Sequence, residues 1–414
     1  MQTESGGGTD SGDSGGDTST SAGPLTGEPP GLTSTDSGSG GQTNDVPGTT
    51  GDTDTTAAPD PFSTDTGETT TSSSGGVDSS STSGDSSDSD TGDEPGDGTC
   101  PLALMHQPCD ANSDDVLHAL GINCADTPAE NFVHMYPEPI GGRRVWQVAR
   151  AYGDYIDPMR KKPLWGPWEG EKVLLISTGL LPAPDADGVV TILDDDVYHD
   201  SFPSVNFNDP PFDDNTMPPP MNPAKGSPDP MGFTNCDGVG DCSNTLFDQW
   251  QSGVGDAEDK TWFSFDLTAP AKASGAVADA NGYSFDFAFF SAEFPEYVGS
   301  PYNDIFVVWQ ASENYTGNVV FIKEQPLTVT ALWPVEYKQG APALSGTGFS
   351  KNGGGTAWYR ATGGVNPGET FTLAFAIFDM SDSIYDTTAI LDNFQWDCDG
   401  CVPNEIDSCG IAPM

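Results

Sequence analysis

The C-terminal part of the chain alternates apolar and polar residues with the two-residue period of β-strands. Residues 261–267 read TWFSFDL, and residues 283–290 read YSFDFAFF, which places Phe285, Phe287 and Phe289 on one side of a strand. Five further apolar runs follow, separated by Gly, Pro, Asn or Asp: DIFVVWQ, NVVFIK, AWYRAT, ETFTLAFAIFD and TAILDNFQW. This spacing predicts an all-β fold, an antiparallel, jelly-roll-like β-sandwich, rather than alternating strands and helices.

The pattern upstream is weaker and more interrupted. It predicts strands at 143–150, 172–178 and 189–193 and a short helix from Ser113 to about Leu120, ended by Gly121. Residues 194–235 are dense in proline and aspartate, which a sheet interior does not accept. We expect a long loop or insertion there that covers one face of the sheet, followed by a second short helix at 243–251.

Composition separates the first 99 residues from the rest. They contain no Lys, Arg, Cys or Trp, and nearly all are Gly, Ser, Thr, Asp, Glu or Pro. Such a segment buries too little apolar surface to offset the entropy lost on ordering. The sequence therefore predicts a disordered acidic tether at 1–99 and one β-domain at 100–414, with its core motif region at 173–396.

Charge limits the classes of partner. The chain has 63 acidic and 14 basic residues, a net charge of -49 and a pI near 4.1. The negative charge repels nucleic acid and anionic membrane surfaces, which are therefore poor partners. The same charge attracts divalent cations. Solubility is the simpler alternative explanation for the charge. No apolar run is long enough for a transmembrane segment.

Eight cysteines occur, all in the predicted β-domain. An even number predicts disulfides, an oxidising compartment and thus an extracellular location, although the pairing stays open. The Cys398-Asp-Gly-Cys401 spacing also occurs in redox and zinc sites, but no thioredoxin-like strand–helix context accompanies it. The expected disulfide residues are Cys100, Cys109, Cys124, Cys236, Cys242, Cys398, Cys401 and Cys409.

The stretch FDFAFFSAEFPEYVGSPYNDIFVVW resembles the signature of the choice-of-anchor L domain of bacterial secreted and surface proteins. Two more segments resemble this family, VLLISTG at 173–179 and AILDNFQW at 389–396. The signature positions are Ser291, Glu293, Phe294, Pro295, Glu296, Tyr297, Val298, Gly299, Ser300, Tyr302, Asn303 and Asp304.

The resemblance implies a β-sandwich at the outer surface of a bacterium, in a family with no catalytic activity established for it as a class. An acidic Gly/Ser/Thr tether is similar to the spacer that follows the lipidated cysteine of many bacterial lipoproteins. We therefore expect an N-terminal lipid anchor ahead of the tether, although no lipidated cysteine is present in the chain.

Calcium is the cofactor that the signature loop favours. Carboxylates and side-chain amides in an irregular loop supply the oxygen ligands that Ca²⁺ prefers, and Asp392 and Asn393 add further oxygens. Ordinary turn chemistry is the alternative for Asn303 and Asp304. The candidate ligands are Glu293, Asn303 and Asp304 of this loop and Asp379, Asp382 and Asp386 of a second acidic turn.

The combined features predict a non-catalytic extracellular protein for adhesion or ligand binding, with structural calcium and a glycan or protein as partner. One alternative is a carbohydrate-binding module in which Trp165 and Trp168 contact the sugar. The other is a hydrolase using Glu293 and Glu296 as a carboxylate pair. The predicted β-domain at 100–414 contains no GxSxG motif and the chain contains no HExxH motif, so no catalytic residue is assigned.

Overall fold

A computed structural model describes most of the chain after residue 98. All described residues belong to the unit Asp88–Met414. Residues 1–98 of the predicted tether, most of the proline-rich segment and most of the predicted helix at 243–251 lie outside them. The described residues are 99–139, 141–192, 216–223, 246–247, 250, 257–313, 315–322, 325–328, 336–401 and 409–414.

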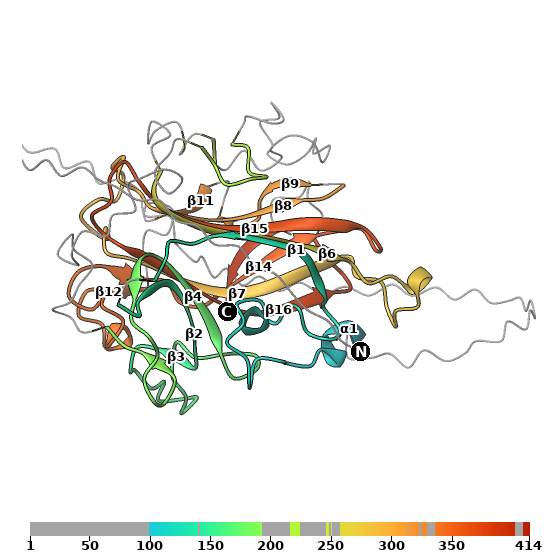
Figure 1. The fold of residues 1–414 in the computed structure, drawn as a ribbon, viewed down its shortest axis with the longest axis horizontal. Helices are drawn as coiled ribbons and strands as arrows, with labels where there is room; N and C mark the ends of the chain where they lie inside the picture. The colour runs from blue at the N-terminus through green and yellow to red at the C-terminus, as the bar shows by residue number, and fades with distance from the viewer. Residues whose placement is uncertain are drawn as a thin grey trace, which may run out of the picture. The chain divides into compact units, whose positions relative to one another are not determined.

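Two antiparallel sheets form two layers, seen edge-on in Figure 1. The first sheet contains β1 (Ala129–Met135), β6 (Ala257–Thr268), β15 (Thr370–Met380), β8 (Ile305–Ala311), β9 (Thr316–Asn318), β11 (Gln325–Thr328) and β10 (Phe321–Ile322). The second contains β12 (Tyr337–Lys338), β13 (Gly354–Gly355), β14 (Tyr359–Gly364), β17 (Gly410–Pro413), β7 (Gly282–Ser291), β16 (Thr387–Asp397), β4 (Val173–Leu181) and β2 (Arg144–Ala149).

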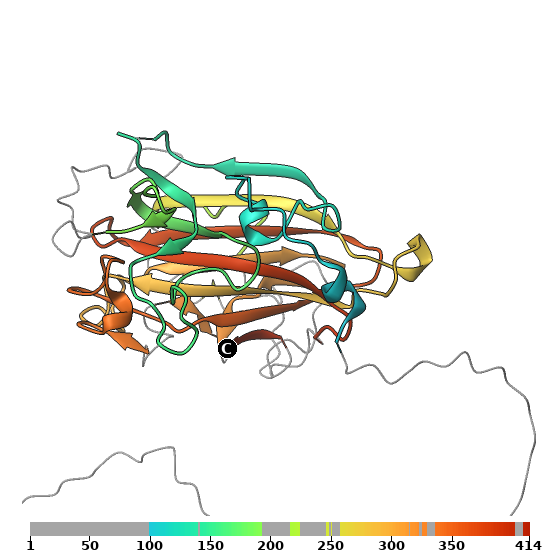
Figure 2. The ribbon, with the colours of Figure 1, turned by 90° about the horizontal axis from the view of Figure 1, so that it is seen from below.

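Successive long strands alternate between the two sheets. Strand β6 belongs to the first sheet, β7 to the second and β8 to the first, and β15 and β16 repeat the change. Figure 2, the view from below, looks onto the face of the sandwich and shows these strands running along a common direction. A small parallel pair, β3 (Ala151–Tyr152) with β5 (Val189–Val190), lies apart from them. The antiparallel β-sandwich expected from the sequence is therefore confirmed.

Helices are few and short in the described residues. The predicted helix at 113–120 is reduced to one 3₁₀ turn, because the Asp115 carboxylate accepts the backbone N–H of Leu117 and Gly121 ends the turn at φ 84°. Sequence analysis did not predict the short α1. The helical elements are α1 (Pro101–Met105), η1 (His118–Leu120), η2 (Lys272–Ser274) and η3 (Pro342–Leu344).

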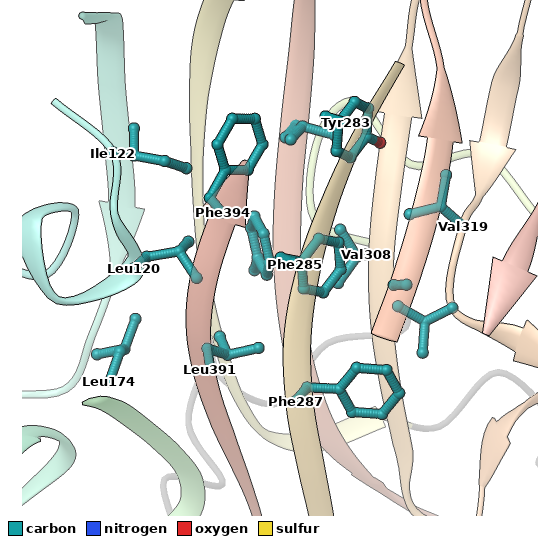
Figure 3. Packing of buried hydrophobic residues seen from close by; sticks show 14 of the residues in the cluster. Leu120, Ile122, Leu174, Tyr283, Phe285, Phe287, Val308, Val319, Leu391 and Phe394 are labelled. Carbon is teal, nitrogen blue, oxygen red and sulfur yellow. The ribbon is translucent and has the colours of Figure 1, made fainter. Parts of the chain in front are cut away.

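The main core is a layer of aromatic rings between the sheets (Figure 3). Phe375 of β15 stacks on Phe263 at 4.9 Å between ring centroids and meets Phe285 of the facing sheet edge-on at 5.4 Å. Phe287 lies 5.8 Å from Phe306 across the same interface. Each buried phenylalanine contributes about 1.5–3 kcal/mol, and the predicted inward face of β7 is confirmed.

A separate apolar cluster covers the outer face of the first sheet. Met221, in the described part of the proline-rich segment, and Trp250 pack there against strands β8 and β15. The Trp250 ring meets the Phe378 ring edge-on at 6.2 Å. This part of the segment lies over one face of the sheet, as expected from its composition.

Three disulfides lie in the described residues. They join Cys100 to Cys398, Cys109 to Cys124 and Cys401 to Cys409, with S–S distances of 2.01, 2.02 and 1.96 Å. Each cysteine of the Cys398-Asp-Gly-Cys401 motif bonds to a cysteine outside the motif, so the motif is neither an internal redox pair nor a zinc pair. Cys236 and Cys242 lie outside the described residues.

Candidate functional site

Two loops meet at one end of the sandwich. The first, 292–304, connects β7 to β8, and the second, 381–386, connects β15 to β16. The register pairs Thr387 with Ser291 and Phe378 with Ile305, so both loops leave their strands at the same end of the sandwich. Strand order thus brings together acidic residues that are 75 to 93 positions apart in the chain.

Glu293 and Asp304 form the centre of this end. Glu293 Oε2 accepts the backbone N–H of Asp304 at 3.2 Å, and both side chains are about 1% exposed. Asp304 Oδ2 also accepts the hydroxyl of Thr387 and, at 3.4 Å, that of Ser291. The two carboxylates are therefore held by fixed strand ends and not by a mobile surface turn.

The second loop adds three carboxylates to the same neighbourhood. Asp379 is 1% exposed and lies close enough to Asp304 and Asp386 for their charges to raise its pKa. The charge of Asp382 raises the pKa of both Glu293 and Asp304. The six predicted ligands therefore gather at one end, and buried Asn303 precedes Asp304 there. They form the acidic end cluster: Glu293, Asn303, Asp304, Asp379, Asp382 and Asp386.

Burial makes the charged form of these groups costly. It is the main cause that raises the pKa of Glu293 to about 7 and the pKa of Asp386 to about 7. Burial followed by the charge of Glu293 raises the pKa of Asp304 well above its ordinary value. Burial followed by the charge of Asp304 does the same for the pKa of Asp379. Among the described residues, no basic side chain forms an ion pair with the acidic end cluster.

Asp379 shows this deficit most clearly. Among the described residues, neither of its carboxylate oxygens has a hydrogen-bond partner, although the Thr178 hydroxyl is near enough to offset a little of its raised pKa. Two buried oxygens without a donor are costly. In the described part of the chain, His, Cys, Asp and Glu side chains form no group of three or more arranged as a metal site.

Two further residues contribute to the acidic end cluster, and neither is among the predicted ligands. Asp259 of β6 is 3% exposed and lies near enough to Asp379 to raise the pKa of that residue. Gly179 of β4 lies under the Asp386 carboxylate, and a Cβ added to it would be 1.8 Å from Asp386 Oδ2. The polar run AEDK gave no signal for Asp259, whereas Gly179 belongs to the VLLISTG segment that resembles the family.

Other candidates lie elsewhere. Glu296 is exposed while Glu293 is buried, so the two do not form a carboxylate pair facing one cleft. Asp392, in the middle of β16, accepts the backbone N–H groups of Trp168 and Glu169. Asn393 donates to Asp286. These contacts are structural and distant in the strand from the acidic end cluster.

The two tryptophans do not form a common sugar-binding platform. Trp165 is fully buried, its indole N–H donates to the Ala343 carbonyl at 2.7 Å, and its ring packs on Phe290. Trp168 is 43% exposed, and the Arg160 guanidinium lies 3.8 Å from the centroid of its ring. Trp165 is a core residue in this structure, and only Trp168 is accessible.

Comparison with known proteins supports the resemblance noted in the sequence. The family model of the choice-of-anchor L domain matches residues 234–395. The match includes β6, β7, β8, β15 and most of β16, and hence the whole acidic end cluster, whereas β4 lies outside it. No curated protein and no solved structure matches the chain. None of the described helices is long and apolar enough to span a membrane.

Proposed function

We propose that this protein is a non-catalytic binding module. The match of residues 234–395 to the choice-of-anchor L domain, a domain of bacterial surface-associated or secreted proteins, supports this role. The acidic end cluster holds a calcium ion that fixes the loops 292–304 and 381–386. The observation that carries the proposal is the buried Asp379 carboxylate, which has no hydrogen-bond partner among the described residues and lies near other carboxylates. The ion serves the fold, and the module contacts its ligand through other surfaces.

Charge balance is the physical reason for a cation. Several buried carboxylates that repel one another cost free energy in proportion to their ionisation. A divalent cation reverses the sign of that interaction, because each carboxylate then faces an opposite charge. Calcium suits the site because it accepts six to eight oxygen ligands in an irregular arrangement.

The proposed ligand set mixes oxygen types. Asp379, Asp304 and Glu293 supply carboxylates, and the Asn303 amide, backbone carbonyls of the two loops and water supply the rest. Such a set does not require three acidic side chains to converge before the ion arrives. Small rotations of Asp382 and Asp386, each at a loop position, bring further oxygens within reach.

Thermal and chemical unfolding of the full chain in excess calcium and in excess chelator tests the proposal. At free calcium about 100 times the dissociation constant, the free energy of unfolding should rise by about 2.7 kcal/mol. Asp379→Asn should remove this rise. Glu296→Gln, an exposed carboxylate of the same signature loop, is the matched control and should keep it.

The sign of the Asp379→Asn effect in chelator distinguishes the alternatives. If the cluster binds no metal, neutralising a buried carboxylate without a partner should simply raise stability in every buffer. A variant that is more stable than the parent protein both with calcium and with chelator would contradict the proposal. So would a parent protein whose unfolding midpoint is unchanged by calcium.

A further inference from the structure

A cleft of about 610 Å³ opens beside β2, away from the acidic end cluster. Strand β2 and the start of β4 form one wall, and the turn 184–188 forms the other. Three of its lining residues are basic, three are acidic and one is aromatic: Arg144, Arg150, Lys172, Asp114, Asp185, Asp187 and Trp146.

The segment that lines this cleft has a charge unlike that of the rest of the chain. Residues 143–172 contain seven of the 14 basic residues and only four acidic ones. The segment is thus net positive within a chain of net charge -49. The cleft lining itself carries three basic and three acidic side chains, so its attraction for an anion depends on which of the basic groups is left without a carboxylate partner.

Two of the three basic residues are already paired. Arg150 Nη2 lies 2.9 Å from Glu171 Oε2, and Lys172 Nζ lies 2.8 Å from Asp114 Oδ1. Arg144 instead lies over the Trp146 ring, with its guanidinium carbon 4.9 Å from the ring centroid. Within the described residues, no carboxylate pairs with it.

The contact with Trp146 fixes the guanidinium without neutralising it. Trp146 is half-buried, and Tyr136 supports it at 5.8 Å between ring centroids. Arg144 itself is exposed at the start of β2. The cleft therefore presents an oriented cation that is ready to bind a planar anion through two parallel hydrogen bonds.

We propose that this cleft binds carboxylate-bearing sugar units of an acidic polysaccharide. The sugar carboxylate pairs with Arg144, and the apolar face of the pyranose ring packs against the exposed part of Trp146. Hydroxyl groups donate to Asp187, whose exposed side chain lies at the rim of the cleft. Alternating acceptors and donors beside an aromatic ring suit a polyhydroxylated ligand better than an apolar one.

Calorimetric titration of the full chain with an oligogalacturonate tests this inference. The matched probe is the carboxyl-reduced, neutral oligosaccharide of the same length and linkage, and both titrations contain chelator so that the acidic end cluster plays no part. The acidic oligosaccharide should bind and the neutral one should not. Arg144→Ala should weaken binding about tenfold or more, the usual effect of losing a charge-assisted hydrogen bond.

Arg160→Ala is the matched control, because Arg160 also stacks on a tryptophan but does not line the cleft. It should bind like the parent chain. Equal binding of both oligosaccharides, or unchanged binding by Arg144→Ala, would overturn the role of the carboxylate. Equal binding of a polyglutamate peptide would overturn the sugar class, and absence of binding by either oligosaccharide would overturn the site.

Discussion

His106 is a buried residue held between two carboxylates. Its Nδ1 lies 2.7 Å from Asp126 Oδ2, and its Nε2 lies 3.4 Å from Glu169 Oε1. Burial lowers its pKa, but hydrogen bonds and the negative charges of Glu169 and Asp126 outweigh burial, so the net pKa is raised above 6.5. The charged imidazole thus joins the segment after α1 to the loop before β4.

This raised pKa predicts a pH dependence of stability. A histidine with a higher pKa in the folded state stabilises fully below its unfolded pKa of 6.5, and the contribution is lost as pH rises through the folded pKa. The free energy of unfolding in chelator, measured by urea at a series of pH values above 6, should fall less steeply in His106→Gln. Parallel curves for the two proteins would contradict this role.

Single residues were predictable where local sequence determines their surroundings. Asn303 and Asp304 precede a strongly apolar strand, so their place at a strand entrance follows from the pattern. Trp165 was not predictable in this way, because its burial depends on a carbonyl 178 residues later, that of Ala343. An aromatic residue followed by Gly and Pro in sequence looks the same whether the fold covers it or not.

At the scale of elements, β4 contributes to the acidic end cluster through Gly179, whose lack of a side chain leaves room for the Asp386 carboxylate. Because a Cβ at Gly179 would overlap the Asp386 carboxylate, Gly179→Ala must displace that carboxylate. We expect the variant to lose most of the stabilisation by calcium. Leu180→Ala, at the next and partly exposed position of the strand, should retain it in the same unfolding assay. If calcium raised the free energy of unfolding of the two variants equally, Asp386 would not be part of the metal site.

The strands themselves were predictable to the extent that they are amphipathic or wholly apolar. The long strands β6, β7, β15 and β16 coincide with the predicted runs because each buries an inward face of large side chains. Strand β1 was not predicted. It is an edge strand with almost every residue exposed, so its sequence does not alternate apolar and polar residues. Its existence depends on pairing with β6.

At the scale of the whole molecule, the Cys100–Cys398 disulfide closes a loop with a sequence separation of 298, against 15 for Cys109–Cys124. Because a longer loop restricts the unfolded chain more, its removal should cost more stability. Replacing both cysteines of the long loop by serine should lower the free energy of unfolding by on the order of 5 kcal/mol. The short-loop double variant should lose about 3 kcal/mol, and the reverse order in urea titrations would contradict this reasoning.

The same disulfide determines how the folded unit responds to tension. Cys398 directly follows β16, which is hydrogen-bonded to β7 on one side and β4 on the other. A pull on the chain ahead of Cys100 therefore passes through a covalent bond into an interior strand and bypasses α1 and η1. While the bond is intact, tension between the chain ahead of Cys100 and the chain after Cys398 cannot extend the residues between them.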